Sequence, residues 1–282
     1  MKRFAGALTL AVLASVAVPA VPAPSSAASP AGATFRWTGV LSQGGLLAGE
    51  APAGAVSVTL DGRAVPLSRD GRFVIGFDRD AGPTATLIAT MADGRTVRQP
   101  LAIAPRAWRI ERLNTLPKFP APDPVMARLR PPELAAIRAA RATSTDAQGW
   151  RQRLVWPVTG RQTGWFGSQR VYRGEPGSYH SGADIAKPVG SVVIAPADGV
   201  VVLAADHPFT LEGNLLVVDH GMGLNSAFLH LSRIDVKVGD HVRQGQPIAL
   251  TGMTGRATGP HLHWSVRWRE AQLDPLLVAG PL

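Results

Sequence analysis

The histidines of this chain are gathered in its second half. All seven lie between His180 and His263, and an acidic residue, Asp184, follows His180 by four positions. His261 and His263 are separated by a single residue. Two imidazoles and one carboxylate, with a fourth position left for water, form the ligand set of a catalytic zinc site. The chain has no Cys, which excludes thiolate ligands and a Cys nucleophile.

The spacing of these residues sets conditions on the fold. In an extended chain His180 and Asp184 would lie about 13 Å apart, too far for both to reach one ion easily. A bend is therefore needed, and Gly182 lies between them. On a strand, His261 and His263 leave the same face with their backbones about 6.6 Å apart. These two rings can therefore meet in one pocket.

Hydrolysis at a metal also needs groups that move protons and stabilise an oxyanion. A histidine that binds the metal cannot readily take this role, so further histidines are expected nearby. His230 and one ring of the pair His261 and His263 are the candidates. Short patterns such as His-x-His arise often by chance, so spacing alone leaves the assignment open.

Five segments together resemble the lysostaphin-type zinc metallopeptidases, also called the M23 or LytM-domain family. The segments are His180–Asp184, Asp219–Gly223, His230–Leu231, Val238–Gln246 and Gly252–His263. They occur in the family's order and at its usual spacing, and the resemblance covers residues 155 to 275. It implies a mainly antiparallel β-sheet with a groove walled by loops.

The resemblance also implies roles for individual residues. His180, Asp184 and His263 would bind one zinc ion per chain, and His230 and His261 would be a catalytic pair that does not bind the metal. The chain departs from the family pattern at none of these positions. The implied activity is endopeptidase cleavage of cross-links in bacterial peptidoglycan. Among these cross-links, the composition and the N-terminal module favour D-Ala–diaminopimelate bonds over glycine bridges.

Two other functions are compatible with parts of the sequence. Some family members have lost their ligands, so the main alternative is a catalytically silent envelope module that binds the wall or activates another wall hydrolase. The intact ligand and catalytic set argues against it. The run from Val238 to Thr251 also resembles half of a biotinyl- or lipoyl-type carrier, but the nearby Lys237 precedes the turn that a carrier would modify.

Several other residues near these motifs are predicted to have structural roles. His220 follows an apolar strand and is expected to brace a turn or the site. Trp165 and Phe166 could line the groove, although aromatic side chains in a β protein more often lie in the core. Asn214 could hold the loop that faces the site through hydrogen bonds.

The elements that position these residues are predicted to be mainly β. Residues 29–105 are expected to form a small accessory domain, an immunoglobulin-like sandwich, because Asp-Gly turns separate short β-prone runs. Its strands are expected over residues 55–60, 63–67, 73–77 and 85–91. Residues 106–150 are predicted to be a Pro-rich connector with a short helix, which begins at Pro131 and Pro132 and ends near Ala142.

Residues 151–282 are predicted to form the metallopeptidase domain, an antiparallel β structure with a groove. Strands are expected over residues 192–205, 214–219, 226–231, 247–251 and 261–268, with Gly-containing turns between several of them. No helix is expected in this region.

The N-terminus has the pattern of a secretory signal over residues 1–28. Lys2 and Arg3 precede an uncharged, mostly apolar run, and small-residue cleavage sites follow. A retained membrane anchor is the alternative, but the run is shorter than the roughly 20 apolar residues that a span needs. We therefore expect an exported, periplasmic protein with no stable membrane insertion after cleavage of the signal.

The chain is basic, with a formal net charge of +9. In the cytoplasm such a charge would suggest nucleic acid. Outside the membrane, cell-wall carboxylates or anionic lipid headgroups are the acidic partners, so we expect peptidoglycan and not nucleic acid. An exported protein without Cys forms no disulfides, and its core or a bound metal must supply its stability.

Overall fold

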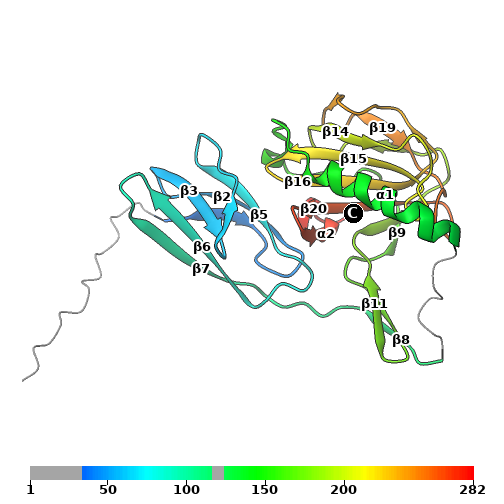
Figure 1. Ribbon diagram of the computed structural model, residues 1–282, viewed down its shortest axis with the longest axis horizontal. Helices are drawn as coiled ribbons and strands as arrows, with labels where there is room; N and C mark the ends of the chain where they lie inside the picture. The colour runs from blue at the N-terminus through cyan, green and yellow to red at the C-terminus, as the bar shows by residue number, and fades with distance from the viewer. Residues whose placement is uncertain (1–33, 116–123) are drawn as a thin grey trace, which may run out of the picture. The chain divides into compact units, whose positions relative to one another are not determined.

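The computed structural model describes residues 34–115 and 124–282 (Figure 1). The predicted signal over residues 1–28 and the Pro-rich stretch of residues 116–123 lie outside the described residues. Within the described ranges, no helix is both long enough and apolar enough to cross a membrane.

Two antiparallel sheets are built from residues 36–102. One has the order β1-β2-β5, with β1 at Arg36–Gly39, β2 at Leu46–Glu50 and β5 at Arg72–Gly76. The other has the order β4-β3-β6-β7, with β3 at Ala55–Leu60, β4 at Arg63–Val65, β6 at Thr84–Met91 and β7 at Thr96–Ala102. Phe73 and Leu87, from different sheets, belong to one buried core.

The strands that the sequence did not predict here lack a clear hydrophobic pattern. In β2, Gly49 interrupts the apolar pattern, because the Phe73 ring occupies the space that a side chain at this position would need. In β7 most side chains are at least partly exposed, so apolar residues do not alternate along it. The predicted strands at 55–60, 63–67, 73–77 and 85–91 are confirmed within a few residues at each end.

The segment that follows these sheets joins the second half of the chain as a strand. β8 (Ile110–Leu113) pairs in parallel with β10 (Gln169–Tyr172), and β10 pairs with β11 (Glu175–Tyr179). We predicted only a connector for this segment. The pairing brings residues 110–113 into one sheet with β11, the strand that ends just before His180, although the two are far apart in sequence.

Helix α1 covers Pro124–Ala142, so the prediction that it begins at Pro131 was wrong. Pro124 occupies the first turn, where a missing N–H has no cost. Pro131 and Pro132 lie inside the helix and each remove a backbone hydrogen bond there. Packing offsets this loss, because α1 lies against β14 and β15 and buries Ile137 in a small apolar cluster (Figure 1).

A larger antiparallel sheet forms the centre of the second half. Its order is β18-β14-β15-β16-β20-β12-β9, with β21 also paired to β20. The bounds are β9 at Arg161–Gly164, β12 at Ala183–Ala186, β14 at Gly199–Ala204, β15 at Asn214–Gly221, β16 at Leu224–Leu231, β18 at His241–Val242, β20 at His261–Trp268 and β21 at Ala271–Leu273. Fully buried Trp264, Phe228 and Leu216 belong to its core.

A smaller sheet has the order β13-β19-β17, with β13 at Val192–Ile194, β17 at Arg233–Ile234 and β19 at Pro247–Leu250. We predicted one strand over residues 192–205, but it is divided into β13 and β14. Pro196 lies between the two parts and has no N–H to donate to a ladder. The other four predicted strands of this region are confirmed by β15, β16, β19 and β20.

The expectation that residues 151–282 contain no helix was wrong. Helix α2 covers Pro275–Ala279, and its N-cap is Asp274, whose carboxylate accepts the backbone N–H of Leu276 at 3.0 Å. An Asp followed by Pro is a sequence signal for a helix start. A short 3₁₀ turn, η1 (Gly149–Arg151), precedes β9.

Candidate metal centre

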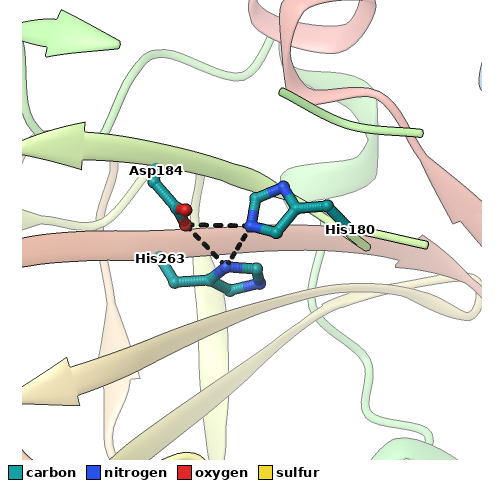
Figure 2. A group of neighbouring side chains, drawn as sticks. All are labelled: His180, Asp184 and His263. Atoms are coloured by element: carbon teal, nitrogen blue, oxygen red, sulfur yellow. Dashed lines mark hydrogen bonds and ion pairs between the residues drawn. The ribbon is translucent and has the colours of Figure 1, made fainter. Parts of the chain in front are cut away.

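Two neighbouring strands position the predicted ligands. β12 and β20 are antiparallel, and in their register Asp184 lies opposite His263. His180 precedes β12, and its side chain points back to Asp184 (Figure 2). The bend that the sequence required occurs at Gly182, where an added Cβ would collide with the Trp264 carbonyl and the His263 ring. A glycine is therefore needed for the chain to pass so close to β20.

The three side chains converge on one small volume (Figure 2). His180 Nε2 lies 3.1 Å from Asp184 Oδ1, His263 Nδ1 lies 2.8 Å from the same oxygen, and the two nitrogens are 3.1 Å apart. All three potential ligand atoms lie within 4.8 Å of one another. In tetrahedral zinc with ligands near 2.1 Å, such atoms are about 3.4 Å apart. The donor set and its spacing therefore fit zinc after a small outward movement.

Protonation states in the cluster favour a cation. Burial alone would raise the pKa of Asp184, but hydrogen bonds from His180 and His263 hold it well below its usual range. Burial lowers the pKa of His263. Burial also opposes charge on His180, but the hydrogen bond and negative charge of Asp184 outweigh it and raise the pKa of His180. A metal ion would take the place of the proton that makes His180 a cation beside the ionised Asp184 carboxylate.

Backbone contacts orient His180, the first of the predicted ligands. His180 Nδ1 lies 3.2 Å from the Trp165 carbonyl, which can only accept, so the hydrogen-bond network assigns the proton to Nδ1 and leaves Nε2 free to bind a metal. Trp165 follows Gly164, the residue of β9 that lies opposite Asp184. An added Cβ at Gly164 would overlap the Asp184 carboxylate. Such outer contacts fix the orientation of metal ligands.

His230 and His261 lie beside the ligand cluster without completing it. Their ring centroids are 4.8 Å apart, and His261 Nε2 is 3.9 Å from Asp184 Oδ1. His230 Nδ1 is 2.9 Å from the Thr254 carbonyl, and His261 Nδ1 is 2.8 Å from the Gly259 carbonyl. Because a carbonyl only accepts, both rings are assigned a proton on Nδ1 and a lone pair on Nε2. Burial lowers the pKa of His230 to about 4.

The backbone of His230 is held in an uncommon conformation. Its φ is 63°, in the left-handed region that residues other than glycine seldom adopt. Its N–H donates to the carbonyl of Glu212 at 2.8 Å. The conformation persists because neighbouring elements hold it in place, and such strain is concentrated at functional sites.

Helix α1 contributes to this support, which the sequence did not predict. Arg130 donates two hydrogen bonds to the Glu212 carboxylate, at 2.5 and 2.8 Å. Glu133 accepts the N–H and the hydroxyl of Thr210 at 2.7 and 2.6 Å. Arg130 and Glu133 are three residues apart on the helix and also form an ion pair. The sequence signal for this support was an Arg and a Glu three residues apart, a spacing that places opposite charges on one face of a helix.

The remaining predictions near the site concern four residues. His220 is fully buried between the Asp198 carbonyl and the Ser226 hydroxyl, at 2.8 and 2.9 Å, which confirms a bracing role. Phe166 is buried, whereas Trp165 remains 37% exposed. The side-chain amide of Asn214 donates to the Leu231 carbonyl at 2.9 Å, and the backbone N–H of Asn214 donates to the hydroxyl of Thr254 in the loop before β20.

The sequence profile of Peptidase family M23 matches residues 178–275. The peptidoglycan DD-endopeptidases ShyA and ShyB of Vibrio cholerae are 48% and 43% identical to this chain over 103 residues, which make up 36% of this chain and 24% of each relative. The DD-carboxypeptidase/endopeptidase Mpg of Neisseria meningitidis is 38% identical over 102 residues, 36% of this chain and 23% of Mpg. The match thus spans about a quarter of the length of these curated relatives.

A solved structure extends the likeness beyond the matched segment. A protein from Pseudomonas aeruginosa, described provisionally as a peptidase M23, has a TM-score of 0.66 and 28% sequence identity to this chain. The superposition covers 86% of this chain and 96% of that one. The similarity therefore includes regions that precede the matched residues 178–275.

Proposed function

Because residues 178–275 form a peptidase family M23 domain, we propose that this chain is a zinc-dependent endopeptidase that hydrolyses peptide cross-links of bacterial peptidoglycan. The observation that carries the proposal is the convergence of His180, Asp184 and His263, whose potential ligand atoms lie within 4.8 Å. His230 and His261 stand beside them with the two ring centroids 4.8 Å apart. A silent module would have no need for both sets.

The ligand residues and the catalytic pair have different tasks in this proposal. His180, Asp184 and His263 would hold one zinc ion, which supplies Lewis acidity toward the scissile carbonyl and a water molecule. His230 and His261 would move protons through Nε2, because a backbone carbonyl occupies Nδ1 of each ring. One ring accepts a proton from the attacking water, and the other, once protonated, stabilises the oxyanion or protonates the leaving amine.

The favoured substrate bond is D-Ala–diaminopimelate. ShyA and ShyB are named DD-endopeptidases of peptidoglycan, and they share the segment that contains the ligands. A bond of this type lies in the wall, outside the inner membrane, so the proposal includes export to the periplasm. The basic charge of the chain suits a substrate that carries carboxylates.

The experiment is digestion of defined cross-linked muropeptides by the purified zinc-loaded protein, with mass spectrometry of the fragments. Release of two stem peptides by hydrolysis of the D-Ala–diaminopimelate bond supports the proposal. Peptidoglycan binding without any fragment release, at full zinc occupancy, would instead identify a silent wall-binding module. Cleavage of glycine bridges alone would support the enzyme class, a peptidoglycan endopeptidase, but would overturn the choice of the D-Ala–diaminopimelate bond.

A further inference from the structure

An exposed cation and an exposed aromatic ring form a pair beside the metal ligands. The guanidinium carbon of Arg109 lies 3.9 Å from the centroid of the Trp165 ring. Trp165 is 37% exposed and Arg109 is exposed as well. Neither side chain takes part in the steps proposed above, so the pair has no assigned role.

Backbone contacts connect this pair directly to the cluster. The Trp165 carbonyl accepts the Nδ1 proton of His180, and Trp165 follows Gly164, which lies opposite Asp184 in the sheet. On the other side, the carbonyl of Arg109 accepts the N–H of Gln169 at 2.9 Å. This bond comes immediately before the parallel pairing of β8 with β10. Both residues are thus fixed by paired strands next to the ligands.

The charge of Arg109 is not neutralised within the described part of the chain. No carboxylate of the described residues forms an ion pair with it, whereas Arg170 on the adjacent β10 is paired with Glu111 at 2.7 Å. A guanidinium that lies over an indole keeps the N–H groups of its edge available for an anion. Two parallel N–H groups match the two oxygens of a carboxylate.

We propose that Arg109 and Trp165 form a subsite for a free carboxylate of the substrate's stem peptide. This inference rests on the proposed function, because it names how that substrate is held. Arg109 binds the carboxylate through its edge, and the Trp165 ring covers the apolar part of the same residue. The subsite therefore selects stem peptides with a free carboxylate over amidated ones.

The test compares three forms of the zinc-loaded full-length protein: wild type, Arg109→Ala and Arg98→Ala. Arg98 is an exposed residue of β7, and its substitution removes the same charge. Each protein is assayed on a cross-linked muropeptide with free stem carboxylates and on its amidated counterpart. The readouts are kcat, KM and zinc content.

A charge-assisted hydrogen bond of this kind is expected to change affinity by roughly tenfold to a hundredfold. Arg109→Ala should raise KM for the free carboxylate by this factor, with zinc content unchanged and kcat little affected. It should not raise KM for the amidated substrate, which the wild type should already bind weakly. Arg98→Ala should behave as wild type on both.

Two results would overturn the subsite. One is an unchanged KM in Arg109→Ala, and the other is an equal loss on the free and amidated substrates, which would indicate that the pair only supports the loop. If the wild type cleaves neither substrate, the proposed function fails. The subsite is then decided by calorimetric binding of the un-cross-linked stem peptide in its free and amidated forms to the same three proteins.

Discussion

Arg130 on helix α1 forms a bidentate ion pair with Glu212, the residue whose carbonyl accepts the N–H of His230. The side chain and the backbone of Glu212 therefore connect α1 to a proposed catalytic histidine. Helix α1 precedes the segment that the family profile matches. The support of the site thus begins outside the residues that identify the family.

Loss of this ion pair should reduce turnover without removing the metal. We expect Arg130→Ala to lower kcat by about 10- to 100-fold, because a catalytic group displaced by about 1 Å can cost 100-fold. KM and zinc content should stay near the wild-type values. Arg128→Ala, an exposed arginine on the same helix, is the matched control. A fall in zinc content equal to the fall in kcat would contradict a role restricted to His230.

Removal of the proposed carboxylate ligand should abolish zinc binding. Asp184→Ala deletes the anionic member of the ligand set, and its oxygen contacts both ligand nitrogens. Elemental analysis of the purified variant should show a loss of most of the one zinc ion per chain, with no cleavage activity. Asp206→Ala serves as control, since Asp206 is exposed and also contacts a histidine, His207. Full zinc retention in Asp184→Ala would disprove the ligand assignment.

His230 and His261 should be required for chemistry and not for metal. His230→Ala and His261→Ala should each retain zinc and fold, and each should cleave about 100- to 10,000-fold more slowly, the usual cost of a lost proton-transfer group. Activity and zinc are measured on the same preparations, with His207→Ala, an exposed histidine, as control. If His261→Ala lost zinc while His263→Ala retained it, the roles within the His-x-His pair would be reversed.

Glu133 should make the stability of the protein dependent on pH. Burial would raise the pKa of Glu133, but hydrogen bonds from Thr210 and Arg130 outweigh it, and the net pKa lies below its usual value. A depressed folded-state pKa contributes stability that is present above the unfolded value of about 4.3 and is lost as the pH falls through the folded value. Glu133→Gln should therefore lose stability at pH 7 and approach the wild type below about pH 4.

Urea unfolding at several pH values measures this difference, in the presence of a chelator so that zinc release at low pH has no influence. Glu111→Gln is a suitable control because Glu111 forms an exposed ion pair with Arg170 and such pairs contribute at most about 1 kcal/mol. A stability difference between Glu133→Gln and wild type that stays constant with pH would show that the Glu133 carboxylate is not the source.

How much of this arrangement follows from the sequence depends on whether the determining contacts are local. The alternation in His261 and His263 predicts two rings on one face, and the structure places them on β20 as expected. The position of Asp184 opposite His263 depends on the pairing of β12 with β20. No local pattern encodes that register, and only the family resemblance anticipated that these residues meet.

Non-local contacts also explain why the start of α1 and the strand β8 were not predicted from the sequence. Pro131 and Pro132 disfavour a helix interior, yet packing of Ile137 and the ion pairs of Arg130 and Glu133 stabilise it there. Likewise, residues 110–113 have no strong strand pattern and become β8 because β10 offers an unpaired edge. In both cases tertiary contacts outweigh local preference.

The place of β9 in the large sheet has a practical consequence. β9 covers one side of β12, and residues 161–164 precede the matched segment 178–275. A protein trimmed to that segment would leave the backbone of β12 unpaired on that side, next to Asp184. Unpaired edges of this kind recruit strands from other molecules. Such a fragment would therefore be expected to self-associate through the strand that carries Asp184, the proposed zinc ligand, and would lose activity by aggregation while all the proposed ligand residues were still present.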